Sequence, residues 1–457
     1  MLDQIFKAYD IRGIYPDQID APTCRRIGAA FARFVADGDG ATRVLVARDM
    51  RPSGPELVAA FTEGALSQGL DVVDIGMVST DLLYFAAGRL DAPGAVFTAS
   101  HNPAQYNGIK LCRSGARPIG EDTGLRTIKA SAATDLAPAA SRGTVSEADL
   151  LAEFARHVHA FVDASVLRPL KVVADTANGM GGLVVPVVFA DLPFALEILF
   201  AELDGTFPNH PADPIQPENL VDLQRRVLET GADVGLAFDG DADRVFLVDE
   251  KAQPLSGSLT TSMVASAMLD RHPGATIVHN LICSKSVADI VREKGGTPVR
   301  TRVGHSYIKQ VMAETGAVFG GEHSGHYYFA DNWRADSGLI AAVVVLEQLC
   351  RADQPLSQLR LPFERYAASG EINTRLDDSA GLAGDPAAVI ETVAATFARV
   401  HPEAQMDRLD GLTVNLADWW FNLRASNTEP LLRLNLEANT ATEVDQHVAE
   451  VRAAFRA

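Results

Sequence analysis

Cysteine is scarce in this sequence, and the few that occur form no metal-binding or disulfide pattern. The 457 residues contain only Cys24, Cys112, Cys283 and Cys350, which are far apart and include no CxxC pair. Disulfide frameworks and structural zinc sites need closer or regularly spaced cysteines. We therefore expect four free thiols in the reducing environment of the cytoplasm.

The sequence also lacks a long apolar segment. Residues 338–350 form the longest near-apolar run, and Glu347 interrupts it. Because about 20 apolar residues are needed to cross a bilayer, this run predicts a buried helix. The first residues show no basic stretch followed by an apolar core, which predicts that there is no signal peptide. No membrane partner is expected.

Basic residues are outnumbered by acidic ones. The sequence has 40 Lys and Arg against 59 Asp and Glu, a formal net charge of −19. This balance argues against nucleic acid as a partner. Screening over about 8 Å still allows a local basic cluster to bind a small anion. With 47% hydrophobic and 22% charged residues, the chain is globular rather than disordered, and its length predicts three or four domains.

The usual nucleotide-binding loops are missing as well. Residues 178–182 are rich in glycine, but Val184 stands where a dinucleotide-binding loop needs its third glycine. No phosphate-binding loop of the G-x-x-x-x-G-K-[ST] type occurs either. The sequence therefore gives no support for a nucleotide cofactor.

What the chain does have is a repeated order of strands and helices. A strand rich in glycine, alanine and valine opens into a polar loop three times, at residues 98–103, 239–244 and 321–326. Each of these strands follows two earlier strands and the helices between them, a pattern that predicts largely parallel sheets with ligands at the strand ends. The last part of the chain breaks this order and predicts a small α+β domain.

These patterns predict an α/β protein of four domains around a central cleft. Three similar α/β domains with mixed, mainly parallel sheets would precede the C-terminal α+β domain. Polar or proline-containing stretches at residues 130–146, 249–254 and 361–363 mark the boundaries. The expected domains are residues 1–146, 147–253, 254–362 and 363–457.

Three aspartates alternate in the second polar loop. Asp239, Asp241 and Asp243 directly follow an expected strand, and hard divalent cations prefer such oxygen ligands. An EF-hand is excluded because Arg244 stands at the sixth position, where that loop needs glycine. A solvated acidic turn is the alternative interpretation. We favour a magnesium site that works with a phosphate-bearing partner.

The other loops offer a hydroxyl group and groups that bind hydroxyls or phosphate. The first places Ser100 and His101 on a turn, where a serine is often only a helix N-cap. In the third, Glu322 and Ser324 can bind sugar hydroxyls, although a capped helix start is an equally good interpretation. A fourth loop can cradle a phosphate dianion, and its residues are Arg424, Ser426, Asn427 and Thr428.

In this order along essentially the whole chain, the four motifs resemble the α-D-phosphohexomutase family, specifically its bacterial phosphomannomutase/phosphoglucomutase branch. The resemblance implies that Ser100 is the phosphoserine, and that its phosphate and the three aspartates bind Mg²⁺. Glu322 and Ser324 match the sugar contacts of the family, and the fourth loop matches its phosphate site. Further positions that match the active cleft are Tyr9, Arg12, Lys110, Arg244, His305 and His326.

The resemblance also implies a reaction. A hexose 1-phosphate and its 6-phosphate, of mannose, glucose or both, would be interconverted through the phosphoserine and a hexose 1,6-bisphosphate. Glucose or mannose 1,6-bisphosphate would be the activator, and the enzyme would be an isomerase that acts as a monomer or weak homodimer. The expected catalytic group comprises Ser100, His101, Lys110, Arg244 and His326. His326 or Lys110 would handle the hydroxyl proton.

Two positions depart from the family pattern. Ile282 stands where relatives often have a lysine, which Lys285 could replace, and His323 stands where dual-specificity relatives have methionine. The choice between mannose and glucose therefore stays open. Three alternative functions also remain: a phosphoglucosamine mutase, a metal-dependent sugar phosphatase that uses Ser100, and a sugar-phosphate sensor without turnover.

Overall fold

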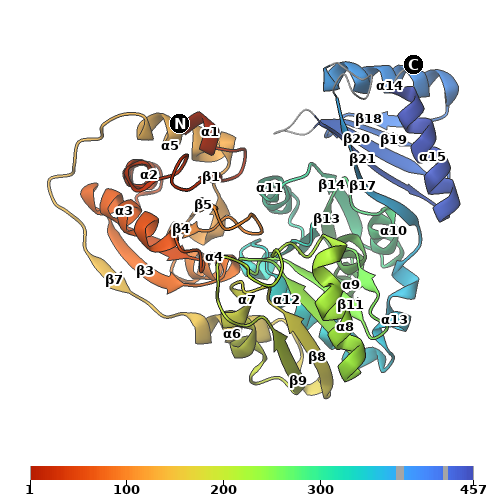
Figure 1. The fold of residues 1–457 in the computed structure, drawn as a ribbon, viewed down its shortest axis with the longest axis horizontal. Helices are drawn as coiled ribbons and strands as arrows, with labels where there is room; N and C mark the ends of the chain where they lie inside the picture. The colour runs from red at the N-terminus through yellow and green to blue at the C-terminus, as the bar shows by residue number, and fades with distance from the viewer. Residues whose placement is uncertain (1, 377–384, 426–430, 456–457) are drawn as a thin grey trace.

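The computed structural model describes residues 2–376, 385–425 and 431–455. Four sheets follow one another along the chain, and we call each sheet with its helices a unit. In Figure 1 the first unit lies at the left, the second at the bottom, the third in the centre and the fourth at the upper right. The predicted architecture of three α/β units and a C-terminal α+β unit is confirmed.

The first unit is built on a seven-stranded sheet. Its strands are β1 (Ile11–Ile14), β2 (Arg43–Arg48), β3 (Asp71–Met77), β4 (Gly94–Phe97), β5 (Tyr106–Arg113), β6 (Arg117–Pro118) and β7 (Val145–Glu147). Its helices are α1 (Leu2–Ile5), α2 (Ala21–Asp39), α3 (Gly54–Ser67), α4 (Thr80–Arg89) and α5 (Arg126–Ala132). At the start of α2, Asp20 accepts a hydrogen bond from the Thr23 amide, and Gly40 ends the helix in the left-handed conformation.

The second and third units repeat the same plan. The second contains α6 (Leu151–His159), β8 (Leu170–Asp175), α7 (Gly181–Phe189), β9 (Phe194–Leu199), α8 (Val221–Thr230), β10 (Val234–Phe238), β11 (Val245–Asp249) and β12 (Pro254–Leu255). The third contains α9 (Gly257–Arg271), β13 (Thr276–Asn280), α10 (Lys285–Glu293), β14 (Thr297–Thr301), α11 (His305–Thr315), β15 (Phe319–Gly321), β16 (Tyr327–Phe329), α12 (Gly338–Ala352) and α13 (Leu356–Leu359).

Strand order shows that these three units are versions of one topology. The sheets contain the paths β5-β4-β2-β3, β11-β10-β8-β9 and β16-β15-β13-β14. In each path the last three strands are parallel and the first is antiparallel to its neighbour. The loops β4–β5, β10–β11 and β15–β16, each of which joins a parallel strand to its antiparallel neighbour, therefore occupy equivalent places in the three sheets. These are the three polar loops that the sequence singled out.

The fourth unit is an antiparallel sheet of five strands with two long helices. Its elements are β17 (Ala367–Arg375), α14 (Pro386–Val400), β18 (Gln405–Asp407), β19 (Leu412–Asn415), β20 (Trp420–Ala425), β21 (Leu431–Ala438) and α15 (Ala441–Ala454). Phe397 and Phe421 are almost completely buried between the helices and the sheet, and burial of each contributes about 1.5–3 kcal/mol.

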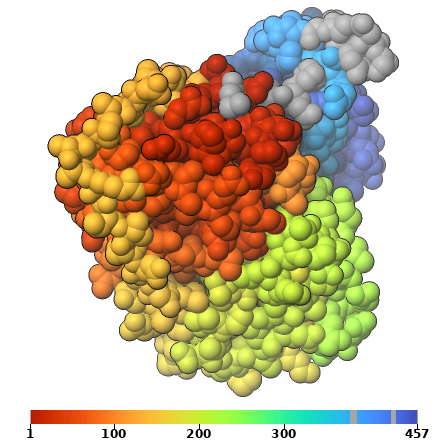
Figure 2. All heavy atoms as spheres, turned by 60° about the vertical axis from the view of Figure 1, so that its left-hand side comes forward, coloured from red at the N-terminus to blue at the C-terminus, as the bar shows by residue number. Residues whose placement is uncertain are grey.

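The hydrophobic cores show how the units are joined. One continuous core runs from α4 of the first unit through β8 of the second to α9 and α12 of the third, whereas the fourth unit has a core of its own. The first and second units also form one continuous surface in Figure 2, with the fourth unit behind them. The first three units therefore form one block, to which the fourth is attached separately.

Two expected boundaries fall at the edges of sheets. The boundary after residue 146 lies inside β7, which pairs with β3, and the boundary after residue 253 separates β12 from its partner β11. Strands of two or three residues are too short to give a periodic signal, so the sequence could not locate them. The expected buried helix is α12, nearly all of whose residues are buried. Within the described residues, no helix combines the length and apolarity needed to span a membrane.

Candidate active site

The three equivalent loops meet at one place, although they are far apart in the sequence. Ser100 Oγ donates a hydrogen bond of 2.8 Å to Asp239 Oδ2, so the first loop touches the second. His326 Nε2 of the third loop lies 3.7 Å from Asp243 Oδ1 of the second. A Cβ atom on Gly240 would overlap the Ser100 carbonyl oxygen, so the close approach of the first two loops requires glycine at this position.

Ser100 stands in an unusual backbone conformation. Its φ of 49° is in the left-handed region, which a serine rarely occupies. Its amide donates a 2.9 Å hydrogen bond to Thr98 Oγ1, and its carbonyl oxygen accepts one of 2.9 Å from Arg51. Such a strained residue persists only where its surroundings hold it. The loop thus presents the Ser100 hydroxyl in a fixed place.

Arg51 is the residue that holds this loop, and the sequence did not reveal it. Its side chain has no solvent exposure, and all five of its N–H groups are used. The acceptors are the carbonyl oxygens of Ser100, Asn102, Pro103 and Tyr106 and the carboxylate of Asp49. The only available signal was the Asp-Met-Arg-Pro-Ser run after β2, which is typical of a turn that ends a strand.

The aspartates form the cluster that their alternation predicts. One carboxylate oxygen of each lies within 4.8 Å of the others, and all three side chains are buried. Asp241 Oδ1 and Asp243 Oδ1 are buried without a hydrogen-bond partner. Buried carboxylate oxygens without partners are costly, and three hard oxygen donors are what Mg²⁺ takes. The residues present therefore fit a divalent cation.

Lys110 lies on β5, which the sequence did not predict as a strand, and it faces the cluster. Its Nζ is 2.8 Å from Asp241 Oδ2 and 2.6 Å from Asp243 Oδ2. Burial alone would lower the pKa of Lys110, but the two carboxylates raise it well above its ordinary value. Burial would likewise raise the pKa of Asp241, yet the ammonium group holds it below its ordinary value. Lys110 is therefore a fixed positive charge beside the proposed metal ligands.

Arg244 joins the first two loops. Its backbone amide and Nε donate to Asp239 at 3.1 and 2.8 Å, and its NH2 lies 3.4 Å from Ser100 Oγ. The same nitrogen donates to His101 Nδ1 at 2.7 Å. Burial, together with the charges of Arg244 and Arg12, lowers the pKa of His101 to about 2. His101 is close to Ser100 as expected, but its Nδ1 lone pair is occupied by the arginine.

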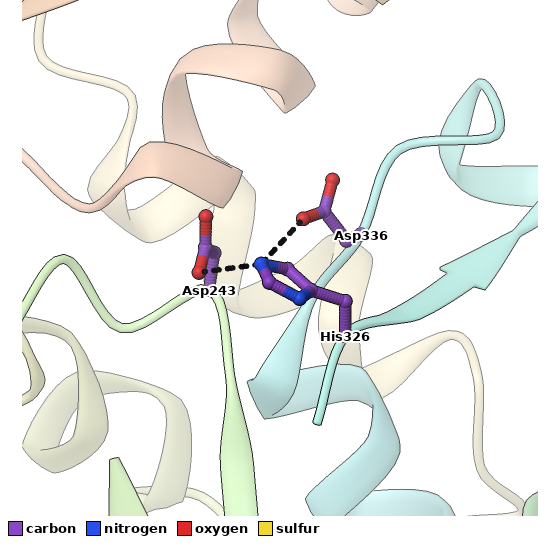
Figure 3. A group of neighbouring side chains, drawn as sticks. All are labelled: Asp243, His326 and Asp336. Atoms are coloured by element: carbon purple, nitrogen blue, oxygen red, sulfur yellow. Dashed lines mark ion pairs between the residues drawn. The ribbon is translucent and has the colours of Figure 1, made fainter. Parts of the chain in front are cut away.

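His326 lies between two carboxylates. Figure 3 shows its ring directed between Asp243 and Asp336, and Nε2 is 3.7 and 3.9 Å from them. In the sequence, the loop around His326 offers no neighbouring residues that complete a set of metal ligands. The structure brings two carboxylates to it, but Lys110 and Lys309 already pair with them. His326 Nδ1 is 3.0 Å from Ser324 Oγ.

Two further residues expected in the third unit are Glu322, which is buried just after β15, and His305, which is half-buried at the start of α11. Glu322 accepts hydrogen bonds from Tyr328 at 2.6 Å and from Asn280 at 3.0 Å. His305 packs edge-on against Tyr9, with ring centroids 5.5 Å apart, and its Nδ1 is buried without a hydrogen-bond partner. Burial lowers the pKa of His305 well below its ordinary value, so it is a neutral ring with a free polar atom.

Arg12 and Arg424 lie outside the aspartate cluster. Arg12 donates a 2.5 Å hydrogen bond to Asn102 Oδ1, next to the Ser100 loop, and pairs with Asp10. Arg424 donates to Glu371 at 2.9 Å, and its Nε is buried without a partner. Ser426, Asn427 and Thr428 lie outside the described residues.

The two departures from the family pattern, Ile282 and His323, line one cavity near the start of α9. His323 Nδ1 is 2.9 Å from Ser258 Oγ at the start of α9. Lys285, the candidate replacement for the missing lysine, lines a cavity with Arg300 and Trp420 and with none of the expected site residues. The structure thus places Lys285 apart from the proposed catalytic group.

Comparison with known proteins defines the class. Models of four successive domains of phosphoglucomutase/phosphomannomutase match this chain: α/β/α domain I at residues 3–137, domain II at 152–253, domain III at 256–366 and the C-terminal domain at 371–454. The four units are therefore those of a phosphosugar mutase.

Individual relatives are similar in sequence to this chain over almost its full length. Phosphomannomutase of Salmonella montevideo is 41% identical over 444 residues, which cover 95% of this chain and 94% of the relative. Phosphohexose mutases of Xanthomonas campestris pv. campestris are 40% identical over 436 residues, 94% of each chain. A phosphoglucomutase/phosphomannomutase family protein of Burkholderia thailandensis superposes with a TM-score of 0.87 at 34% identity, covering 99% of this chain and 97% of its own. The chain belongs to the phosphoglucomutase/phosphomannomutase family and is a phosphohexomutase, an isomerase of hexose phosphates.

Proposed function

We propose that this phosphohexomutase interconverts the 1-phosphate and 6-phosphate of mannose, glucose or both through a phosphoserine at Ser100. The observation that carries the proposal is the contact of Ser100 Oγ with Asp239 and Arg244, at 2.8 and 3.4 Å. A hydroxyl placed between a metal-ligand candidate and a guanidinium group is positioned to hold and transfer a phosphoryl group. The names of the relatives support mannose as one substrate.

The phosphoryl group would move twice in one cycle. Phosphorylated Ser100 gives its phosphoryl group to the free hydroxyl of the bound sugar phosphate, and the P–O bond to Ser100 breaks as the bond to the sugar oxygen forms. The product is the hexose 1,6-bisphosphate. After this molecule turns end for end, Ser100 Oγ takes the other phosphoryl group and the isomeric monophosphate remains. Glucose or mannose 1,6-bisphosphate added from outside would phosphorylate Ser100 and so activate the enzyme.

The metal site supports this chemistry. Asp239, Asp241 and Asp243 would hold Mg²⁺, with the phosphate on Ser100 as a further ligand. Mg²⁺ there supplies charge neutralisation for a phosphoserine that carries about −1.5 to −2 charges at pH 7. Arg244 and Lys110 add fixed positive charge for the phosphoryl oxygens.

His326 is the better candidate for the hydroxyl proton. Lys110 is held by two aspartates, and the pair raises its pKa well above its ordinary value, so it does not readily release a proton. His326 Nε2 has only long contacts of 3.7 and 3.9 Å to its carboxylates. This nitrogen can therefore accept the proton of a sugar hydroxyl that enters the cleft.

Substrate binding would use the third and fourth units. Glu322 and Ser324 would bind the sugar hydroxyls, with Tyr9, Arg12 and His305 at the edge of the cleft. Arg424, with Ser426, Asn427 and Thr428, would bind the phosphate that is not reacting. The separate core of the fourth unit supports a rotation that closes this phosphate site over the bound sugar.

A coupled assay distinguishes the remaining functions. The purified enzyme is given mannose 1-phosphate or glucose 1-phosphate with Mg²⁺ and a trace of glucose 1,6-bisphosphate, and both the 6-phosphate and free phosphate are measured. Formation of the 6-phosphate supports the proposal. Free phosphate without the isomer indicates a phosphatase, binding without either product indicates a sensor, and turnover of glucosamine phosphate alone indicates a phosphoglucosamine mutase.

We also infer a cytoplasmic enzyme that acts as a monomer or weak homodimer. Four free and buried cysteines support a reducing compartment. The three polar loops meet within one chain through the contacts of Ser100 with Asp239 and of His326 with Asp243, which supports activity as a monomer. Dilution that leaves specific activity unchanged would agree with this inference.

A further inference from the structure

The cavity lined by Lys285 lies between the third and fourth units, and no residue of the Ser100 loop lines it. It has a volume of about 230 Å³, which is enough for a small organic ion. Its walls come from β13, α10 and β14 of the third unit and from β19 and β20 of the fourth. Ten residues line it: His279, Leu281, Cys283, Lys285, Ala288, Arg292, Pro298, Arg300, Asn415 and Trp420.

Three of the lining side chains are basic, and none is acidic. Arg300 pairs with Asp407, and Arg292 lies 3.3 Å from Asp289. Two of the three charges therefore have carboxylate partners that do not line the cavity. Within the described parts of the chain, the ammonium group of Lys285 has no carboxylate within 4 Å. An anion in the cavity would find an unpaired positive charge and two guanidinium groups.

His279 adds a hydrogen-bond acceptor to this wall. Its side chain is only 5% exposed, and its Nδ1 lies 3.0 Å from the Asn280 carbonyl oxygen. Burial lowers the pKa of His279 to about 4, so the ring is neutral at pH 7. Nδ1 therefore carries the proton and donates it to the carbonyl, which leaves Nε2 as an acceptor. A ligand hydroxyl would satisfy this atom.

Trp420 lines the cavity from the side of the fourth unit. Its Nε1 donates a 2.8 Å hydrogen bond to Glu437 Oε2, and the same carboxylate oxygen accepts from the backbone amide of Lys285 at 2.9 Å. The indole and the start of α10 are thus joined through one carboxylate. Trp420 and Arg424 belong to the same strand, β20, about 13 Å apart at the rise of an extended strand.

We infer that this cavity is a binding site for a small hydroxylated anion, a phosphate ester or a hydroxycarboxylate, that bridges the third and fourth units. The anion contacts Lys285, Arg292 and Arg300, its hydroxyl donates to His279, and its carbon atoms pack on Trp420. Because its two walls belong to different units, the bound anion stabilises the arrangement of the units seen here relative to any other. The bound anion thereby restrains β20, the strand that carries Arg424, and slows turnover. This effect on turnover rests on the proposed function.

Binding is tested apart from activity. Isothermal titration uses the Arg424→Ala variant, so that the proposed phosphate site of the active cleft is weakened. Inorganic phosphate, glycerol 1-phosphate and malate are titrated separately. We expect one molecule of glycerol 1-phosphate or malate to bind, and the two arms distinguish a phosphate ester from a hydroxycarboxylate. If none of the three anions shows saturable binding, the cavity holds only solvent and the inference is overturned. A preference for inorganic phosphate, which has no hydroxylated carbon chain, would also overturn it.

A matched pair of lysine variants locates the bound anion. Adding Lys285→Met should weaken binding about tenfold or more, because a charge-assisted hydrogen bond is lost. Lys294 is also exposed but pairs with Asp270 outside the cavity, so Lys294→Met should change the affinity by less than about twofold. Equal losses in both variants would contradict the assigned site.

The effect on turnover is a separate measurement. With Arg424 intact, the anion that binds should lower kcat, and Lys285→Met should relieve this inhibition while leaving uninhibited turnover unchanged. Binding without any effect on kcat would overturn the coupling to the fourth unit. An enzyme that lacks mutase activity but still binds the anion would overturn the proposed function and leave the cavity site standing.

Discussion

Arg51 shows how much a single buried residue contributes to the proposed site. Its five donors hold the loop that carries Ser100 from behind, while the hydroxyl group faces Asp239 and Arg244. The charge on Ser100 would change in every cycle, and a loop fixed through its carbonyl oxygens keeps its backbone in place. Arg51 is thus a positioning residue.

Substitution of Arg51 by lysine tests this role. Arg51→Lys keeps the charge but cannot reach four carbonyl oxygens, so we expect kcat to fall about 10–100-fold with little change in KM. The midpoint of thermal unfolding should also fall. Arg43→Lys is the control, because Arg43 donates to the Leu90 carbonyl oxygen at an exposed place far from Ser100. A rise in KM with an unchanged kcat would count against a positioning role.

A pH dependence of stability is expected from His210. Burial alone would lower the pKa of His210, but the hydrogen bonds and charge of Asp175, 3.0 Å away, raise it. Because the pKa is raised in the folded state, the stabilisation is complete below the unfolded value of about 6.5 and is lost as the pH rises through the folded value. The loss should be on the order of 1 kcal/mol or less.

Urea unfolding between about pH 5.5 and 8.5 measures this effect. His210→Gln should flatten the decline in stability over this interval, whereas His272→Gln, at an exposed helix end, should leave the slope unchanged. An identical slope in the wild-type protein and in His210→Gln would show that this pair does not control the dependence.

At the level of the elements, the equivalent loops of the three related sheets determine the site. Sequence reasoning could find them, because each follows an apolar strand and begins at a recognisable turn. It singled out Ser100, the three aspartates and Glu322 as candidate site residues for this reason. It could not find β5, which carries Lys110, or the contact between Arg51 and the loop. Both depend on strand pairing and packing between residues distant in the chain, which leave no local pattern.

Gly240 tests the close approach of two loops. Gly240→Ala should force the second loop away from the Ser100 carbonyl oxygen, so we expect kcat to fall about 100-fold. Gly38 lies within α2 with only the Arg113 side chain near its Cβ position, and Gly38→Ala should raise stability by about 0.5–1 kcal/mol without affecting kcat. Comparable activity of both variants would argue against a tight contact between the loops.

For the whole molecule, the attachment of the fourth unit determines how the cleft closes. That unit has its own core and meets the third through polar contacts such as Arg300 with Asp407 and Val303 with Asp410. Polar interfaces of this kind permit relative motion of domains. The four-unit order was predictable from repeated motifs, but the continuous core of the first three units was not, because it forms only in three dimensions.

Small-angle scattering can detect this closure. We expect the radius of gyration of the Ser100→Ala variant to decrease when glucose 1,6-bisphosphate and Mg²⁺ are added, because the ligand would join Glu322 to Arg424. The double variant Ser100→Ala/Arg424→Ala should show a smaller decrease or none. A radius that stays constant in the single variant at saturating ligand would argue against closure by the fourth unit.

The central claim is that Ser100 carries the phosphoryl group during each cycle. The enzyme is incubated with glucose 1,6-bisphosphate that bears radioactive phosphate, and peptide mapping then locates the label. We expect one phosphoryl group per chain on Ser100, its transfer to added mannose or glucose 1-phosphate, and a fall in kcat of at least about a thousandfold in Ser100→Ala. Label at another residue, or full turnover by Ser100→Ala, would contradict the mechanism.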